Sequence, residues 1–133
     1  MLIIRNKILP IGSFACMNIL GLLFVREEVV LDEVILNHEA IHTDQQREIL
    51  LLSLAAATAL SNIYATWWWM LLALVMPFAL YALAWLIELI LPPYTSAYKD
   101  SPFEREAYAN QHNPNYLATR PLFAWRKYML KNR

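Results

Sequence analysis

The sequence has little charge, a single cysteine and no run of basic residues. The one cysteine, Cys16, excludes an internal disulfide bond and excludes a CxxC zinc site. Charged residues make up 17% of the chain, against about 25% in ordinary soluble domains. Lys plus Arg balance Asp plus Glu at 11 each, so nothing in the charge points to nucleic acid as a partner. With 133 residues, we expect one domain over 1–133.

Apolar residues fill the middle of the chain, where one long tract is almost free of charge. Between Ile49 and Pro93 only Glu88 is charged. A soluble core helix does not need so long an apolar tract, and a weakly polar stretch at 61–66 divides it. The tract therefore predicts a transmembrane helical hairpin with the lipid bilayer as partner, whose second helix, 67–92, can cross a hydrocarbon core of about 30 Å. The alternative is a soluble protein that buries both helices in a dimer.

The basic residues predict how this hairpin is oriented. All 11 of them lie before Glu48 or after Tyr98. Because Lys and Arg are concentrated in the cytoplasmic segments of membrane proteins, we expect a multi-pass membrane protein oriented by these residues. Both chain ends and the segment before the hairpin would lie in the cytoplasm. Glu88 would lie near the cytoplasmic interface, where it caps the helix or pairs with Arg47.

The N-terminal residues 1–30 contain several turn-forming residues and predict short strands. Apolar runs from Leu2 to Ile8 and from Asn18 to Arg26 suit such strands. A third apolar membrane span over residues 8–25 is the alternative, although proline and glycine residues would interrupt a helix there.

The residues after the hairpin, 101–133, are polar and predict cytoplasmic helices. Ser101 suits an N-cap and is followed by proline at the first helical position, so a helix is expected over Pro102–Asn110. A second helix is expected over Pro121 to Arg133, because its apolar residues share one side. These residues are Leu122, Trp125 and Met129. The whole chain therefore predicts a mostly α fold with a short N-terminal β segment.

Two of the three histidines form the pattern HExxH, from His38 to His42. Residues four apart project from the same face of a helix, so both imidazoles can bind one zinc ion, at about 2.0–2.1 Å from each nitrogen. Glu39 lies one position round, where a carboxylate can hold a water molecule and accept its proton. We expect Asp32 to cap a helix over 32–65 that carries the motif and continues into the first apolar helix.

A catalytic zinc site with two histidines needs a third protein ligand. The third histidine of the HExxHxxGxxH spacing is absent, so His112 is only one possibility. Acidic residues on the expected helix Pro102–Asn110 are better candidates, namely Glu104 and Glu106. These two side chains project about 160° apart on a helix, so only one of them can face the metal. Either glutamate would complete the His₂Glu set of thermolysin-like enzymes.

Two segments carry a resemblance to known peptidases: His-Glu-Ala-Ile-His-Thr-Asp-Gln-Gln from His38, and Glu-Arg-Glu-Ala-Tyr from Glu104. They resemble the gluzincin arrangement of heat-shock and CAAX-processing membrane peptidases and of antirepressor sensor peptidases. The chain also resembles, from about Leu9 to Tyr128, a group of small, largely uncharacterised bacterial membrane proteins with an NHEAIH-type motif, a hydrophobic hairpin and an FEREAY-type segment. The resemblance implies a location in the bacterial inner membrane and a zincin-like active-site helix, and it favours Glu104 over Glu106. It departs at Tyr108, where the peptidases usually have Asp.

The predicted function is peptide-bond hydrolysis by a membrane-anchored zinc metalloendopeptidase. Zn²⁺ would be held by the two histidines and a glutamate, with Glu39 as the catalytic base and Tyr108 as a donor to the developing oxyanion, or only as packing. Gln45 and Gln46 would orient ligands or substrate, and Arg120 would hold a substrate carboxylate or pair with nearby acids. Peptide or protein chains near the membrane are the expected substrates, and a homo-oligomer or membrane partner would complete the pocket. The alternatives are a non-enzymatic regulator or scaffold with a structural zinc site, and an inactive peptidase remnant.

Overall fold

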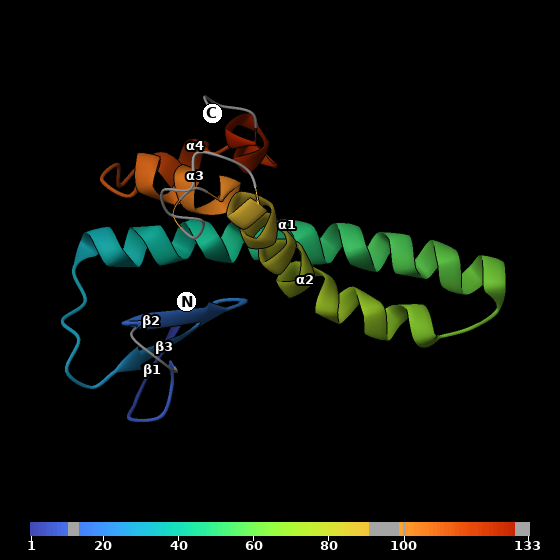
Figure 1. The fold of residues 1–133 in the computed structure, drawn as a ribbon, viewed down its shortest axis with the longest axis horizontal. Coiled ribbons are helices and arrows are strands. Elements are labelled where there is room, and N and C mark those ends of the chain that lie inside the picture. Colours follow the sequence, from blue (N-terminus) through green and yellow to red (C-terminus); the bar gives the residue numbers. More distant parts are fainter. Residues whose placement is uncertain (11–13, 91–98, 100, 130–133) are drawn as a thin grey trace.

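The computed structural model describes residues 1–10, 14–90, 99 and 101–129. It confirms a mostly helical chain with a small sheet at the N-terminus (Figure 1). Two long helices form a hairpin that projects from a body made of the sheet and the C-terminal helices. The strands are β1 (Leu2–Asn6), β2 (Cys16–Ile19) and β3 (Leu22–Arg26), and the helices are α1 (Glu33–Tyr64), α2 (Trp68–Ile90), α3 (Pro102–Asn110), α4 (Tyr116–Thr119) and the 3₁₀ helix η1 (Ala124–Tyr128).

The sheet has the strand order β1-β3-β2, with β1 parallel and β2 antiparallel to β3. A two-residue turn, Leu20-Gly21, joins β2 to β3 with φ of 52° and 94°. Positive φ at both central residues is typical of the type I′ turns that close tight hairpins. The prediction of one strand over Asn18 to Arg26 is therefore wrong, because this turn divides it. The alternative membrane span over 8–25 is also wrong, because residues 16–19 and 22–25 pair as strands.

The edge strand β2 lies against α1 and is attached to it by side-chain amides. Asn18 donates its Nδ2 to the backbone oxygen of Glu39 at 2.5 Å and to Oγ1 of Thr43 at 2.9 Å. From the other side, Gln46 donates to the carbonyl of Asn18 at 3.1 Å and accepts the N–H of Leu20 at 2.5 Å. These bonds satisfy part of the open edge of the sheet and fix its position over the HExxH motif.

Helix α1 is one continuous helix of 32 residues, which confirms the predicted run from the motif into the apolar tract. Asp32 caps its start, because its Oδ1 accepts the backbone N–H of Ile35 at 2.7 Å. The helix ends at Ala65, which adopts the left-handed conformation and donates its N–H to the carbonyl of Ser61. Its first half lies between the sheet and α3, and its second half forms one arm of the hairpin (Figure 1).

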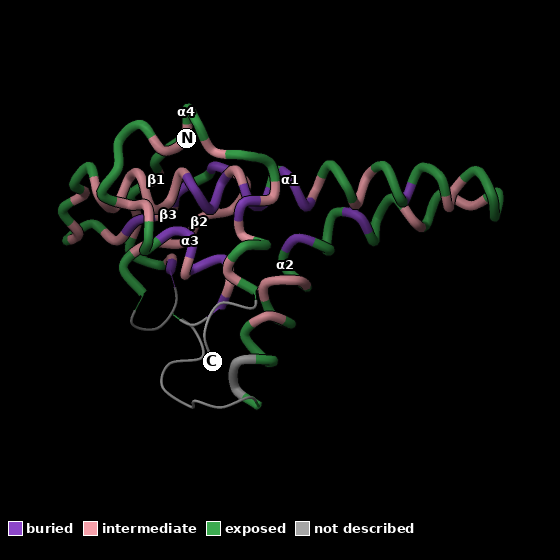
Figure 2. Tube along the Cα trace, turned by 90° about the horizontal axis from the view of Figure 1, so that it is seen from above, coloured by how far each residue is buried: buried purple, intermediate pink, exposed green. Residues whose placement is uncertain are grey.

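Helix α2 packs against the second half of α1, and Ala57 and Ala73 are buried between the two helices. Much of the remaining hairpin surface is exposed, as Figure 2 shows. Large apolar side chains make up much of that surface, including Leu51, Leu52, Ile63, Trp68, Leu74 and Val75. Among the described residues, α2 is the one helix long and apolar enough to cross a membrane, over the 20 residues Trp68–Ile87. The predicted helix end at residue 92 lies outside the residues that the structure describes, and so does the side chain of Glu88.

The start of α3 is the one predicted from its sequence. The hydroxyl of Ser101 accepts the backbone N–H of Glu104 at 3.3 Å, and proline occupies the first turn. The cap fixes the direction of α3 where it crosses α1, and thereby the direction of the glutamates on it.

The helix predicted over Pro121 to Arg133 is wrong for the described residues, which form only the 3₁₀ helix η1 there. The physical reason is Glu48, whose carboxylate accepts the N–H of Phe123 at 3.0 Å. Phe123 adopts a left-handed φ of 56°, which no α-helix accommodates. Of the expected apolar side, Trp125 packs on Phe103 with ring centroids 5.1 Å apart, whereas Leu122 is 78% exposed.

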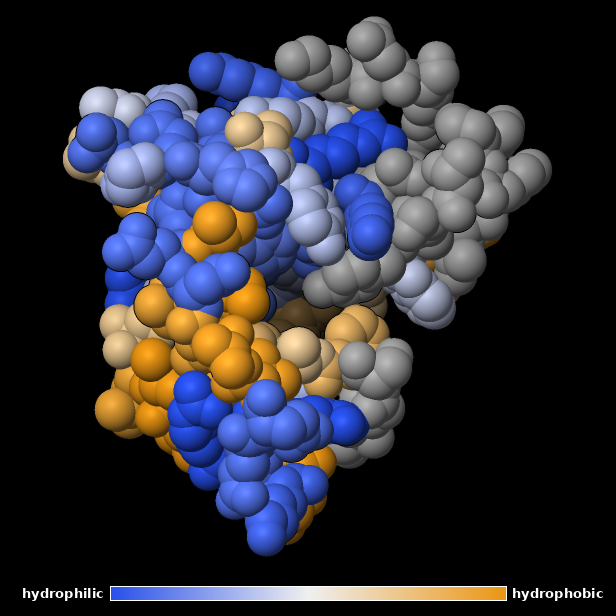
Figure 3. All heavy atoms as spheres, turned by 90° about the vertical axis from the view of Figure 1, so that its left-hand side faces the viewer, coloured by the Kyte–Doolittle hydropathy of each residue, from blue (hydrophilic) through white to orange (hydrophobic). Residues whose placement is uncertain are grey.

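Viewed from the end opposite the hairpin tip, the body shows an apolar zone with polar surface above and below it (Figure 3). Hydrophilic residues cover the helices α3 and α4, hydrophobic residues gather over the sheet, and the surface is hollowed between them. Residues of α1, α3 and β2, together with the segment before β2, line the two cavities that adjoin the candidate site.

Candidate metal centre

His38 and His42 lie side by side on the face of α1 that meets α3. Their spacing of four residues places the rings 4.7 Å apart, centroid to centroid, and nearly perpendicular at 78°. The Nε2 atoms are 3.0 Å apart. Both rings are largely buried, with His42 only 6% exposed. Two imidazole nitrogens therefore converge on one point inside the protein.

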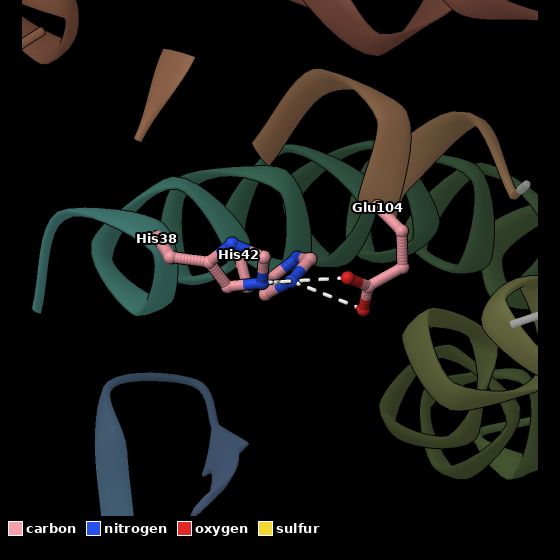
Figure 4. Close-up of side chains that lie close together, drawn as sticks. All are labelled: His38, His42 and Glu104. Carbon is pink, nitrogen blue, oxygen red and sulfur yellow. Dashed lines mark hydrogen bonds and ion pairs between the residues drawn. The ribbon is translucent and has the colours of Figure 1, made fainter. Parts of the chain in front are cut away.

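Glu104 completes the group from α3 (Figure 4). Its Oε2 lies 3.3 Å from Nε2 of His38, and its Oε1 lies 3.2 Å from Nε2 of His42. The candidate ligand atoms of the three side chains all lie within 4.8 Å of one another. A His₂Glu group that could hold a metal ion is thus assembled from two helices.

The spacing of these atoms fits a metal ion. Ligands about 2.0–2.1 Å from a tetrahedral ion lie roughly 3.3 Å from one another. The two Nε2 atoms lie 3.0 Å apart, and each faces a different oxygen of Glu104, His42 facing Oε1 at 3.2 Å and His38 facing Oε2 at 3.3 Å. Two nitrogens and one carboxylate suit zinc, and they also suit other divalent transition metals.

The outer nitrogens of both rings have hydrogen-bond acceptors, which sets their orientation. Nδ1 of His38 lies 3.0 Å from Oε1 of Gln111, and Nδ1 of His42 lies 2.8 Å from Oε1 of Gln45. An amide oxygen can only accept, so each Nδ1 carries the proton and each Nε2 presents its lone pair. This is the arrangement that metal-binding histidines adopt in proteins.

Glu106 points away from the histidines, as expected for a residue two positions from Glu104. It is fully buried, and its Oε1 accepts Nε of Arg120 at 2.6 Å and the hydroxyl of Tyr116 at 2.9 Å. Arg120 also binds Glu48, so it pairs with acids and is not exposed to hold a substrate. The structure thus places Glu104, rather than Glu106, beside the two histidines.

The predicted base, Glu39, lies next to the ligands without joining the group. Burial raises its pKa and the charge of Glu104 raises it further, whereas His42 and His38 lower it in part, so that the net shift is upward. Burial lowers the pKa of His42, whereas Glu104, Glu39 and Gln45 favour its charged form, so that the net shift is upward. A carboxylate with a raised pKa is a stronger base, which suits proton transfer.

Two cavities reach Glu39, and each is also lined by at least one residue of the candidate metal group. The larger, of about 360 Å³, has an apolar wall of N-terminal residues and a polar wall at the site. The apolar wall comprises Leu9, Pro10, Phe14 and Met17, and the polar wall includes Glu39, His42 and Glu104. The smaller, of about 310 Å³, is lined by His38, Glu39 and Tyr108 among others. Solvent or a ligand can therefore approach the metal-binding atoms from either cavity.

Tyr108 lies beside His38 and lines the smaller cavity. Its ring packs edge-on against that imidazole with centroids 4.8 Å apart, and it is 40% exposed. Burial and the charges of Glu104 and Glu39 raise the pKa of its hydroxyl, so the group keeps its proton at neutral pH. His112 lies outside the ligand group, because its Nε2 contacts the amide of Gln111 at 3.2 Å.

Three residues near the site had no predicted role in it. Tyr81 of α2 donates its hydroxyl to Oε1 of Gln45 at 2.7 Å, and Gln111 binds His38. Asn18 holds the backbone of Glu39. In the sequence, an Asn within an apolar strand and a Tyr within an apolar tract were the only signals. Gln45 contacts a ligand as predicted, whereas Gln46 binds the backbone of β2.

Comparisons with known proteins give no match, so the site is interpreted from its geometry alone. No family model matches the chain, and no curated protein or solved structure matches it. The resemblance to gluzincin peptidases therefore stays a prediction.

Proposed function

We propose that this protein is a membrane-anchored zinc metallopeptidase. The observation that supports the proposal is the group of His38, His42 and Glu104 with a half-buried carboxylate, Glu39, beside it. Three protein ligands leave one position of a tetrahedral ion open, which is typical of catalytic zinc sites. Among the described residues no other His, Cys, Asp or Glu joins the group, which argues against a closed structural site.

The chain's own residues supply the proton transfers of peptide hydrolysis. Zinc, when bound, would polarise the peptide carbonyl and lower the pKa of a water molecule. Glu39 accepts a proton from the attacking water while the oxygen of that water forms a bond to the carbonyl carbon. Glu39 then delivers that proton to the amide nitrogen as the C–N bond breaks, so that atoms and charge balance. In this proposal the neutral hydroxyl of Tyr108, which lines the smaller cavity, donates to the oxyanion.

The larger cavity favours an apolar side chain next to the bond that is cut. Apolar residues line it together with the candidate ligands His42 and Glu104, and its volume of about 360 Å³ accommodates one large side chain. Peptide or protein segments that carry such a residue are the proposed substrates.

The hairpin supports a membrane location for the site. The apolar tract begins at Ile49, seven residues or about 10 Å along the helix after His42. Trp68–Ile87 is long enough to cross a bilayer, and the hairpin exposes apolar side chains along its length. We propose that both arms cross the inner membrane and that the site and both chain ends lie on the cytoplasmic side.

The proposal is tested by zinc analysis and by proteolysis with detergent-purified protein. Mass spectrometry of the purified protein is expected to find one zinc per chain. Quenched fluorescent casein is expected to be cleaved by the wild type and not by Glu39→Gln, which keeps its zinc. Glu33→Gln, on an exposed position of the same helix, is the control and should cleave as the wild type does. Absence of zinc from the wild type, or equal cleavage by Glu39→Gln, contradicts the proposal.

A structural zinc site in a regulator or scaffold is the second candidate. It is favoured by the fact that the ligands come from α1 and α3, so that an ion would fasten the two helices together. In that case zinc would be present and casein would not be cleaved by any variant.

A further inference from the structure

Gln45 is a fully buried amide that contacts one of the proposed metal ligands. Its Oε1 lies 2.8 Å from Nδ1 of His42 and also accepts the hydroxyl of Tyr81 at 2.7 Å. Its Nε2 donates to the carbonyl of Phe103 at 3.1 Å and to Oε2 of Glu106 at 2.9 Å. Both the oxygen and the NH₂ group of the amide therefore form hydrogen bonds, and each has its own set of partners.

The partners of Gln45 decide which end of its amide faces His42. The carbonyl of Phe103 and the carboxylate of Glu106 can only accept hydrogen bonds, so they require the NH₂ end. The oxygen must then face His42, which in turn must donate from Nδ1. That leaves the lone pair on Nε2, the atom directed at Glu104. Reversal of the amide would instead place a donor against Nδ1 and favour a proton on Nε2.

Glu106 itself is held in a fixed orientation. Arg120 donates to both of its oxygens, at 2.6 and 3.3 Å, and Tyr116 donates to Oε1. Burial lowers the pKa of Arg120, but its hydrogen bonds to Glu48 and Glu106 outweigh burial and raise it, so the guanidinium stays charged. Both oxygens of Glu106 therefore act as hydrogen-bond acceptors, and the charged partner strengthens these bonds.

We propose that Glu106 is a positioning residue for the metal ligand His42, acting through Gln45. Held by Arg120, its carboxylate fixes the Gln45 amide, and the amide fixes the imidazole tautomer that leaves Nε2 free to bind a metal. The inference rests on the proposed metal centre but not on peptidase activity. It assigns to the second glutamate of the α3 pair a role different from ligation.

The first test is the zinc affinity of Glu106→Gln, measured by competition with a chromophoric chelator. Glutamine at 106 has nearly the same shape, but it can present either an oxygen or an NH₂ group to Gln45. The Gln45 amide is then no longer fixed, and we expect zinc affinity to fall about 10- to 100-fold, as for other residues that orient metal ligands.

Glu48→Gln is the matched control for loss of a buried acid. Glu48 binds the same Arg120 and is also buried, at 6% exposure, but no bond joins it to Gln45 among the described contacts. We expect Glu48→Gln to lower the melting temperature and to leave zinc affinity within about twofold of the wild type. An equal loss of affinity in both variants would show a general structural effect and overturn the proposal.

A double-mutant cycle tests whether the effect passes through Gln45. Gln45→Met removes the amide at nearly constant volume and should weaken zinc binding by itself. In that background Glu106→Gln should change the affinity by less than about twofold, because the connection is already lost. Additive losses, or wild-type affinity in Glu106→Gln, contradict the proposal.

The tautomer can be read without any metal or variant. In metal-free wild-type protein, at a pH where the imidazole is neutral, the ¹⁵N chemical shifts of His42 should report a proton on Nδ1. A proton on Nε2 overturns the inference. If the wild type binds no zinc, the proposed metal centre fails, and the same spectrum of metal-free Glu106→Gln still decides whether Glu106 sets the tautomer.

Discussion

At the scale of single residues, the chemistry of the site follows from which oxygen and which nitrogen face each other. Glu104 and Glu106 are only two positions apart in the sequence, but their environments are entirely different. One faces two imidazoles, and the other faces a guanidinium. Their different partners give the two carboxylates different expected roles, which substitution can separate.

Glu104→Ala is expected to abolish stoichiometric zinc binding. This substitution removes one of the three proposed metal ligands, whereas Glu106→Gln only alters the orientation of the ligand His42. The loss of affinity should therefore exceed the roughly 100-fold upper limit expected for an orienting residue. Equilibrium dialysis against zinc measures it, with the exposed Glu33→Ala as control. Retained one-to-one zinc in Glu104→Ala would falsify the assignment of this ligand.

Cys16 offers a measurement of the charge on Glu39 that needs no metal. Burial raises the pKa of the thiol, Glu39 raises it further, and Arg5 lowers it. Glu39→Gln removes an anion, so the thiol pKa should fall, more thiolate should be present at a given pH, and iodoacetamide should react faster. Arg5→Gln should have the opposite effect. The pH profile of alkylation gives the pKa in each variant, and shifts of the same sign in both variants are inconsistent with this explanation.

At the scale of secondary structure, the site depends on the close approach of the β2–β3 hairpin to α1. Gly21 closes the hairpin at a φ of +94°, and a Cβ atom placed there would lie 3.2 Å from Cγ2 of Thr43. Thr43 follows His42 directly, and Asn18 joins it to the strand. The turn therefore sets the distance between the sheet and the part of α1 that carries the HExxH motif.

Gly21→Ala is expected to destabilise the protein by about 1–2 kcal/mol, because alanine is strained at this φ and its methyl group crowds Thr43. Thermal denaturation in detergent measures the effect. Leu22→Ala, at the next and exposed position, is the control and should change stability by less than about 0.5 kcal/mol. Equal effects of the two substitutions would mean that the approach of the turn to α1 is not tight.

At the scale of the whole molecule, the apolar hairpin and the polar body meet at the candidate metal centre. The first half of α1 carries the ligands, and the second half of the same helix belongs to the exposed apolar arm. Tyr81 of α2 reaches back to Gln45, so the second arm also contacts the site. Insertion of the hairpin into a bilayer would therefore fix the site at its surface.

The hairpin loop is expected to reach the far side of the membrane. In a Cys16→Ser background, Asn62→Cys should be labelled by a membrane-impermeant maleimide in bacterial spheroplasts and not in inverted vesicles. Glu33→Cys should give the reverse pattern and serves as the control. Protection of Asn62→Cys in both preparations would show that the hairpin enters the bilayer without crossing it.

The sequence determined the local features of this fold, because they depend on neighbouring residues. The cap at Asp32, the cap at Ser101 and the pair of histidines four apart on a helix all follow from spacings of a few residues. The length of α1 followed from its apolar tract. The turn at Leu20-Gly21 also depends on neighbouring residues, but it lies within an apolar run and was therefore predicted as part of one strand.

Only the tertiary structure decided which glutamate faces the histidines. Both Glu104 and Glu106 suit the spacing, and the choice depends on how α3 rotates against α1 when Arg120 and Glu48 are buried together. The same contact holds Phe123 in a turn and prevents the predicted C-terminal helix. Contacts between residues more than 50 positions apart depend on packing and on the pairing of buried charges, which no local pattern in the sequence encodes.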